Sequence, residues 1–388
     1  MKILIVSPVS LTPSTRGTTE RILRLALGLN KFNNKVLIFH AGKGKIPNLQ
    51  STSYFSFERL LPAFKYGRLL DRLLAPFNPF LIVKLISWIK RFKPEILQFE
   101  FPILPPFFQK LLKKMLKRKP LIVLDAHNVD YLAFKEVSHP FLYLYTYWIE
   151  RFNVKDCDLL LTVSYEDAIN FTKIYGVAKK KIFLVPNGVN LKKCKGLNQQ
   201  RARRILRLNE DDKIVFFHGG YNLPNLEAAL TIIKNIAPKV KKKVKDVKFL
   251  IAGEICQYLK LDKGMEDGIK LLGYVPNVKL FISAADMCLV PTFKGGGTSL
   301  KILEYLACKK PVITTSKGAR GFNPADFPNL IIRENLEEIT NFIITSFSEE
   351  EKRYFKIDYG KVERIIQRYD WMVISKKLND LYCNLALS

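Results

Sequence analysis

The chain has 388 residues, of which 48% are hydrophobic and 12% aromatic, and its formal net charge is +28. This length and composition exclude a disordered chain and exceed one ordinary domain, so we expect two domains with hydrophobic cores of their own. The charge favours an anionic partner, such as nucleic acid, a phosphorylated substrate or an acidic membrane surface. A lysine-rich solvated surface without such a partner is the alternative.

The six cysteines are scattered along the chain, with no C-x-x-C pair and no nearby histidine. This distribution predicts reduced thiols in a cytosolic protein and argues against a disulfide framework or a zinc site. The N-terminal stretch MKILIVSP is typical of a strand and has neither the longer apolar region nor the cleavage site of a signal peptide.

The first half of the chain alternates strands with helices. KILIVSP, TTERILRLALGL and KVLIFHA predict a strand, a helix and a strand within the first 40 residues or so. Further strands are predicted at 95–101, 121–127 and 159–164, and 181–189 ends in a Pro-Asn-Gly turn. The alternation predicts a Rossmann-like domain over residues 1–190.

The same alternation restarts after a charged stretch of low apolar content, 190–204, which is interpreted as a linker. The second set of strands is predicted at 213–220, 247–253, 269–275, 287–292 and 311–316. A second Rossmann-like domain over 191–370 follows from them. Ligands of such sheets bind at the carboxyl ends of the strands, so we expect a cleft between the two domains.

The stretch 59–92 is basic, aromatic and amphipathic. Its longest uncharged run, Leu73–Val83, is far shorter than the roughly 20 residues that span a bilayer. Its aromatic side chains suit the headgroup layer of a membrane and its basic side chains suit lipid phosphates, which predicts peripheral contact with an anionic surface. A pair of core-facing helices is the alternative. The residues concerned are Arg68, Arg72, Lys84, Lys90, Arg91, Lys93, Phe64, Phe77, Phe80 and Trp88.

Three consecutive glycines, Gly295, Gly296 and Gly297, follow the predicted strand 287–292 and precede a helix for which Thr298 or Ser299 is the expected N-cap. A glycine loop that leads into a helix start presents free N–H groups and the positive end of the helix dipole. This arrangement binds phosphate, so we predict a phosphate site at Gly297 to Leu300.

Helical spacing places Lys301, Glu304 and Tyr305 on a polar face, opposite Ile302 and Leu306. Glu304 lies roughly 7 Å along the helix axis from the loop, where a carboxylate can accept hydrogen bonds from a ribose diol. Lys301 adds a positive charge for a diphosphate. The pattern predicts a nucleoside diphosphate site, and a tight strand-to-helix turn with an exposed Glu is the alternative.

The segment from Gly295 to Thr314 resembles the donor-site motif of the group 1 glycosyltransferases, GGGT-x-x-K-[IV]-L-E-x-[LM]-A-x-x-K-P-V-[IV]-x-T. Other segments resemble the family in the same order along nearly the whole chain. They are 15–29, 125–129, 158–167, 185–190, 216–228 and 271–291. The resemblance implies the α/β fold called GT-B, with two Rossmann-like domains facing across a cleft. It also implies a C-terminal helix, 371–388, that returns to the first domain.

The resemblance further implies a retaining enzyme that moves a sugar from a nucleotide diphosphate sugar to a hydroxyl acceptor, such as a lipid-linked or polymeric glycan. Catalytic roles fall on His127, which would hydrogen-bond the donor sugar or the acceptor, and on Lys301 and Glu304. The expected location is the cytoplasm, including the inner face of the membrane. The implied substrate-binding residues are Gly17, His218, Gly219, Gly220, Gly295, Gly296, Gly297, Thr298, Ser299 and Leu300.

We expect no essential metal and no cofactor apart from the nucleotide sugar as co-substrate, and the acids of DCD (156–158) are interpreted as structural. Glu100 is interpreted as a solvated loop acid, and an acid that faces the acceptor is the alternative. Two departures from the family pattern leave the donor sugar open. Gly296 occupies the place of the first acid of the family's E-x7-E motif, and HGGYNLPNLEA lacks an Arg and a Lys that often clamp the diphosphate.

Two other functions compete with sugar transfer. A catalytically idle GT-B scaffold would explain the two departures, and a basic nucleic-acid-binding protein would explain the charge. The sequence shows no nucleic-acid-binding motif, which weakens the second. An NAD-dependent enzyme is excluded because no G-x-G-x-x-G follows the first strand.

Overall fold

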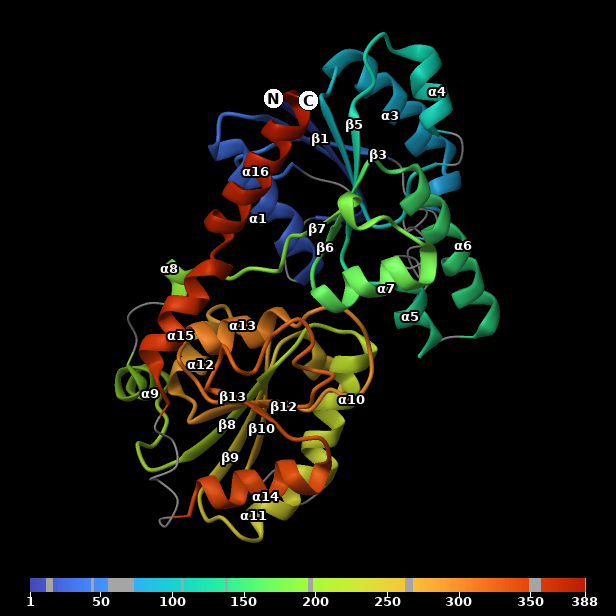
Figure 1. The fold of residues 1–388 in the computed structure, drawn as a ribbon. Coiled ribbons are helices and arrows are strands. Elements are labelled where there is room, and N and C mark those ends of the chain that lie inside the picture. The colour runs from blue at the N-terminus through green and yellow to red at the C-terminus, as the bar shows by residue number, and fades with distance from the viewer. Residues whose placement is uncertain are drawn as a thin grey trace. The chain divides into compact units, whose positions relative to one another are not determined.

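Two compact units make up the described part of the chain. The computed structural model describes residues 1–11, 17–42, 45–54, 73–105, 108–136, 139–194, 198–261, 268–348 and 357–387. Unit 1 comprises Met1–Asn187 and Trp371–Ser388, and unit 2 comprises Gly188–Asp370. In each unit a parallel sheet is flanked by helices (Figure 1).

Unit 1 contains a seven-stranded sheet in the order β3-β2-β1-β4-β5-β6-β7, and every neighbouring pair is parallel. Its strands are apolar runs buried on both faces, as in Ile3 to Val6, which is the pattern of a parallel sheet covered by helices on both sides. The strands are β1 (Lys2–Ser10), β2 (Lys35–Ala41), β3 (Gln50–Tyr54), β4 (Ile96–Glu100), β5 (Leu121–Ala126), β6 (Leu159–Thr162) and β7 (Ile182–Leu184).

One face of this sheet packs against the described helices α3, α4, α5, α6 and α7. Figure 1 shows α1 and α16 on the other side of the sheet. Local sequence signals fix the helix ends: the Asn78 side chain accepts the Leu81 N–H at the start of α3, and Gly176 ends α7 with a φ of +69°. The helices are α1 (Gly17–Lys31), α3 (Pro79–Phe92), α4 (Phe108–Met115), α5 (Asp130–Lys135), α6 (Pro140–Asp156), α7 (Tyr165–Tyr175) and α16 (Trp371–Leu387), with short turns η2 (Ala75–Phe77) and η3 (Lys179–Lys181).

The C-terminal helix α16 belongs to unit 1 and packs against α1. The two helices approach so closely at Gly28 that a Cβ there would lie 2.0 Å from Ser375 Oγ. The buried Tyr382 hydroxyl also donates to Gln98 Oε1 in β4 at 2.7 Å. The last helix of the chain thus completes the core that the first residues begin.

Unit 2 contains a six-stranded parallel sheet in the order β10-β9-β8-β11-β12-β13. Separate hydrophobic clusters cover its two faces. The strands are β8 (Lys213–His218), β9 (Val247–Ala252), β10 (Ile269–Gly273), β11 (Met287–Val290), β12 (Val312–Thr314) and β13 (Leu330–Ile332). The helices are α8 (Leu191–Cys194), α9 (Gln199–Leu206), α10 (Leu223–Thr231), α11 (Ala237–Lys241), α12 (Val278–Ala284), α13 (Leu300–Ala307), α14 (Leu336–Ser346) and α15 (Tyr359–Ile366). A π-helical segment, η4 (Ile232–Ile236), joins α10 to α11, and η5 (Glu254–Tyr258) and η7 (Gln367–Tyr369) are short 3₁₀ helices.

The interpretation of 190–204 as a linker is wrong, because the described residues of this stretch form α8 and much of α9 within unit 2. The guanidinium of Arg203 is buried there. It donates to the Ala284 carbonyl at 3.0 Å and to Asp286 Oδ2 at 2.8 Å. A charged side chain with such partners anchors a helix to a domain.

The predicted membrane-contact stretch 59–92 is only partly visible, since residues 59–72 lie outside the described residues. The remainder forms η2 and α3, and Leu81, Leu85 and Ile89 of α3 are buried in the core of unit 1. Among the helices that the structure describes, none is long and apolar enough to cross a bilayer.

Candidate active site

The glycine loop between β11 and α13 has the backbone that its sequence suggests. Gly295 and Gly297 have φ values of +108° and +76°, a region that other residues rarely adopt, and a Cβ at Gly295 would lie 2.8 Å from Pro224 Cγ. Ser299 is the N-cap of α13 by position, although its side chain makes no capping hydrogen bond. Thr298 lies in the loop just before it, and Gly296 between the two left-handed glycines. The helix start at Leu300 is therefore reached through a turn whose glycines add no side chains of their own.

Lys301 is tied to the other loop that the sequence singled out. Its Nζ lies 2.5 Å from Asn225 Oδ1 in α10 and 4.5 Å from the centroid of the Phe217 ring. Asn225 Nδ2 in turn donates to the Gly220 carbonyl at 2.8 Å. Burial lowers the pKa of Lys301 to about 7, and the nearby carboxylate of Glu304 only partly opposes this. The cluster thus contains a lysine that donates a hydrogen bond to a neutral side chain, Asn225.

Asn225 connects the two loops but was not among the predicted site residues. The sequence signal that could have indicated Asn225 is the N-cap Asn222, three residues earlier. The Asn222 side chain accepts the Asn225 N–H at 2.8 Å, and α10 therefore starts beside the Gly219–Gly220 turn. Gly219 packs tightly on this asparagine, since a Cβ at Gly219 would lie 3.0 Å from its side-chain amide. A larger residue at Gly219 would therefore have to displace the Asn225 side chain.

Glu304 faces two basic groups. Lys279 Nζ lies 2.7 Å from Glu304 Oε1, and His218 Nε2 lies 3.2 Å from Glu304 Oε2. Burial by itself would raise the pKa of Glu304, but the hydrogen bond from His218 and the charge of Lys279 outweigh it and lower the pKa to about 2. The side chain is 28% exposed and is held as a carboxylate with part of its surface open.

A chain of hydrogen bonds orients His218. The Tyr305 hydroxyl accepts the backbone N–H of His218 at 3.0 Å and lies 2.9 Å from His218 Nδ1. With one lone pair occupied, the hydroxyl donates its proton to Nδ1, which leaves the proton of Nε2 for Glu304. Burial lowers the pKa of His218 despite the opposing effect of Glu304, which favours this neutral form.

One expectation about α13 needs correction, and one residue beside it was missed. Tyr305 was placed on the polar face with Lys301 and Glu304, but it is fully buried and bonds β8 through His218. Lys279, from α12, was not singled out at all. Its side chain is 13% exposed, and although burial lowers its pKa, Glu304 and neighbouring groups more than compensate and raise it.

A second polar cluster lies in unit 1, where β4 and β5 end. Arg21 of α1 is buried and makes a two-point contact with Asp125, from Nη2 to Oδ1 at 2.8 Å and from Nε to Oδ2 at 3.1 Å. It also donates to the Pro186 carbonyl at 3.1 Å. His127, which follows β5, stacks on Phe101 at 4.2 Å between ring centroids.

The interpretation of Glu100 as a solvated loop acid is wrong. Glu100 is the last residue of β4, is completely buried, and has Oε2 2.8 Å from His127 Nε2. Its other oxygen accepts from Gln98 Nε2 at 2.6 Å. Burial raises the pKa of Glu100 to about 7, against the opposing charge of Arg21 and the bond from Gln98. A carboxyl group with this pKa beside an imidazole can share a proton near neutral pH.

Metal ligation by this second cluster does not fit the contacts that it makes. Glu100, Asp125 and His127 offer ligand atoms within 4.8 Å of one another. However, Arg21 engages both oxygens of Asp125, and Gln98 and His127 engage those of Glu100. In the DCD stretch, Asp158 accepts from the Ile122 N–H at 2.9 Å and from Lys119, which are structural contacts.

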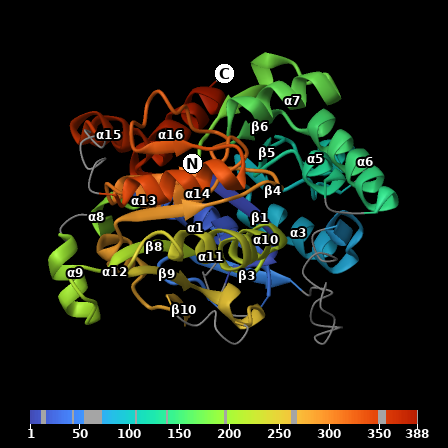
Figure 2. The ribbon, with the colours of Figure 1, turned by 90° about the horizontal axis from the view of Figure 1, so that it is seen from below.

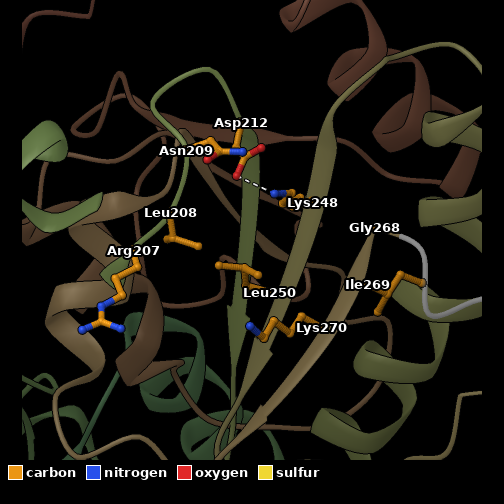
Figure 3. A pocket seen from close by; sticks show the side chains of 9 residues that line it. All are labelled: Arg207, Leu208, Asn209, Asp212, Lys248, Leu250, Gly268, Ile269 and Lys270. Atoms are coloured by element: carbon orange, nitrogen blue, oxygen red, sulfur yellow. Dashed lines mark hydrogen bonds and ion pairs between the residues drawn. The ribbon is translucent and has the colours of Figure 1, made fainter. Parts of the chain in front are cut away.

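Gly17 is the first residue of α1, and the residues just before it, 12–16, lie outside the described part. A separate hollow in unit 2 lies at the amino ends of β8, β9 and β10 (Figure 3), where Lys248 pairs with Asp212 at 2.6 Å. Parallel sheets bind ligands at their carboxyl ends, and the α13 cluster is at that end, so we assign no role to this hollow.

Comparison with known proteins agrees with this geometry. The sequence model "Glycosyltransferase Family 4" matches residues 15–193, and "Glycosyl transferases group 1" matches residues 212–346. The chain belongs to the group 1 glycosyltransferases. The predicted family is confirmed, and with it the prediction that the chain is an enzyme that transfers a sugar.

Relatives and solved structures support the same placement. The chain is 24% identical over 278 residues to the Escherichia coli "UDP-Gal:alpha-D-GlcNAc-diphosphoundecaprenol alpha-1,3-galactosyltransferase", covering 68% of this chain and 70% of the relative. It is 22% identical over 257 residues to the GPI3 subunit of phosphatidylinositol N-acetylglucosaminyltransferase of Saccharomyces cerevisiae, covering 62% of this chain and only about half (54%) of that protein. The sucrose-phosphate synthase of Thermosynechococcus elongatus superposes over 100% of both chains with a TM-score of 0.79 at 16% identity. The predicted GT-B fold class, two parallel Rossmann-like sheets, is confirmed.

Proposed function

We propose that this glycosyltransferase moves a sugar from a nucleotide diphosphate sugar to a hydroxyl of a lipid-linked or polymeric glycan, with retention of the anomeric configuration. The observation that carries the proposal is the cluster at the start of α13. It combines a glycine turn, a helix start and a lysine with a lowered pKa and a neutral partner. These are the groups that a diphosphate needs.

In this proposal the nucleoside diphosphate leaves the sugar as negative charge develops on its phosphates. The bond from the anomeric carbon to the acceptor oxygen replaces the bond to the phosphate oxygen, and the hydroxyl proton of the acceptor passes to the departing phosphate. The N–H groups of Ser299 and Leu300, the dipole of α13 and Lys301, which takes up a proton from solvent when the diphosphate binds, stabilise the developing charge. Lys301 would then supply much of the positive charge that an Arg and a Lys supply in other family members and that HGGYNLPNLEA lacks. The charge of Lys279 is already met by Glu304 at 2.7 Å.

Glu304 is assigned to the ribose. Its carboxylate is kept ionised by Lys279 and His218, and 28% of it is exposed, so its remaining lone pairs suit the two ribose hydroxyls. His218 would hold that carboxylate in place through the Tyr305 bond. Gly219 and Gly220 would let the diphosphate approach the backbone of the neighbouring turn.

Unit 1 is proposed to supply groups for the transferred sugar and the acceptor. His127 is assigned to them, oriented by the ring of Phe101 and by Glu100. No metal is assigned, because amides and Lys301 meet the charge of the diphosphate. The name of the Escherichia coli relative gives a diphosphoundecaprenol-linked acceptor, and together with the net charge of +28 this supports a lipid-linked acceptor at an anionic membrane surface.

The test is a melting-temperature screen against UDP-, GDP-, dTDP- and ADP-sugars, since a ligand that binds the folded state raises its stability. One of these sugars should raise the melting temperature, and the anomer of the product should be that of the donor when NMR follows the reaction. A screen in which no nucleotide sugar shifts the melting temperature would remove the proposal. Inversion of the anomer would remove its stereochemical part alone.

A further inference from the structure

Helix α6 of unit 1 carries a row of exposed apolar side chains, which we call the α6 stripe. Its members are Phe141, Leu144, Trp148 and Phe152, which are 77%, 50%, 56% and 50% exposed. They stand at positions i, i+3, i+7 and i+11 and therefore lie along one side of the helix. Large apolar side chains gathered in this way on a surface mark an interaction site more often than single ones do.

The opposite side of α6 is held firmly, so the stripe is not the result of a poorly packed helix. The buried carboxylate of Glu150 accepts from the Asp130 N–H at 2.8 Å and from the Tyr175 hydroxyl at 2.6 Å, which ties α6 to α5 and α7. Asn153 Oδ1 accepts the Leu104 N–H at 2.7 Å. The helix thus presents the stripe on a rigid support.

Further exposed apolar groups lie next to α6, on η2 and α3. The Tyr145 hydroxyl of α6 donates to the Leu73 carbonyl at 2.5 Å, just before η2. Phe77 and Val83 are 53% and 69% exposed in the turn and the helix that follow. Figure 2 shows α3 and α6 on the same side of unit 1.

On α3 and α6 the basic side chains outnumber the exposed acidic ones. α3 contains Lys84, Lys90 and Arg91 and no acid. On α6 the basic groups are Arg151, whose guanidinium lies 5.7 Å from the Trp148 ring centroid, and Lys155. The acids of α6 are the buried Glu150 and Asp156, its last residue.

We propose that the α6 stripe docks unit 1 on an anionic membrane surface. The apolar side chains would enter the boundary between headgroups and acyl chains, and the basic side chains beside them would meet lipid phosphates. A second copy of this chain is a poor occupant, because pairing would bring together two proteins of charge +28. The inference rests on the proposed lipid-linked acceptor for its purpose, but its evidence is independent of the nucleotide site.

Vesicle sedimentation tests the proposal with the full chain and vesicles of phosphatidylcholine, with and without phosphatidylglycerol. The variant is Phe141→Gln/Trp148→Gln, which keeps the net charge and uses a good helix former. We expect wild type to sediment with the anionic vesicles at low salt and the variant to bind at least about tenfold more weakly. Equal sedimentation of the two proteins would overturn the inference.

A matched control comes from unit 2. Ile205 of α9 is 55% exposed and lies beside arginines, as Trp148 does at 56%. Ile205→Gln should sediment like wild type, whereas Trp148→Gln should bind more weakly. Equal losses in the two single variants would show a general effect of surface hydrophobicity and overturn the assignment to α6.

Fluorescence locates the contact. Brominated acyl chains should quench wild-type tryptophan emission, and Trp148→Phe should sediment normally but lose most of that quenching. Full quenching in Trp148→Phe would place the contact elsewhere. Light scattering tests whether a second copy of the chain binds the stripe instead. A wild-type dimer that Phe141→Gln/Trp148→Gln abolishes would make the stripe a self-association surface.

The nucleotide-sugar melting screen separates this inference from the proposed function. Wild type that responds to a nucleotide sugar but ignores anionic vesicles refutes docking and leaves sugar transfer intact. Wild type that binds vesicles through the stripe but responds to no nucleotide sugar supports docking and removes the proposed function. The docking variant should keep the response of wild type to the nucleotide sugar.

Discussion

Removing the carboxylate of Glu304 should destabilise unit 2 as well as impair activity. The pKa of Glu304 falls from its ordinary value of 4.5 to about 2, and at 1.36 kcal/mol for each pH unit this corresponds to roughly 3 kcal/mol. A glutamate on an exposed polar helix face would contribute almost nothing to the free energy of unfolding. Much of the cost comes from Lys279, whose 13% exposed ammonium would lose its carboxylate.

The sign of the pH dependence follows from the direction of the shift. Because the folded-state pKa of Glu304 is lowered, its contribution is fully present above about pH 4.5 and is lost as the pH falls towards about 2. Glu304→Gln should therefore be less stable than wild type by roughly 3 kcal/mol at neutral pH. The difference should shrink in acid.

Urea denaturation of four proteins measures this: wild type, Glu304→Gln, Lys279→Met and the double variant. The double variant should be more stable than the sum of the two single losses predicts, by about 1–3 kcal/mol, since neither partner is left buried and unpaired. Additive losses, or a Glu304→Gln variant as stable as wild type, would refute the reasoning about the Lys279–Glu304 pair.

Three shorter predictions concern nucleotide binding and turnover. Burial lowers the pKa of Lys301 to about 7, and a bound diphosphate should raise that pKa. Nucleotide binding should therefore take up protons and weaken as the pH rises above about 7. Calorimetry in buffers of different ionisation enthalpy measures this proton uptake, which Lys301→Met should abolish. Glu100→Gln should lower kcat/KM about a hundredfold and remove a pH dependence near 7, while nucleotide affinity stays unchanged. An equal fall in nucleotide affinity would contradict that role for Glu100. EDTA should leave turnover intact, and a loss that Mn²⁺ restores would show that a metal is required.

The two sheets were predictable because their strands are apolar runs bounded by turns, and the glycine turn before α13 because Gly295 and Gly297 need left-handed backbone. The partners of the charged groups were not. Glu100 follows LQF and gives no sign of burial in the sequence, since the groups that make a buried acid tolerable there, Gln98, His127 and the charge of Arg21, are brought together by packing.

Helical periodicity failed on α13 for a physical reason. Helical periodicity predicts which residues share a face, but not what packs against that face. The side of α13 predicted to be polar lies against the end of β8, where Tyr305 is buried and its hydroxyl accepts the His218 N–H. Lys279 and Arg203 were missed or misread because basic residues look solvated in a sequence. Their carboxylate partners lie far away along the chain, which spacing within one segment does not reveal.

The placement of α16 has a consequence for synthesis on the ribosome. The amino-terminal unit needs Ser375 against Gly28 and Tyr382 against Gln98, and both come from the last helix. Unit 2, Gly188–Asp370, is complete before that helix is made. The domain translated first should therefore be the last to finish folding, with the α1 side of its core exposed to chaperones during the interval. A stop codon shortly after Asp370 would therefore leave unit 2 complete and remove part of the core of unit 1.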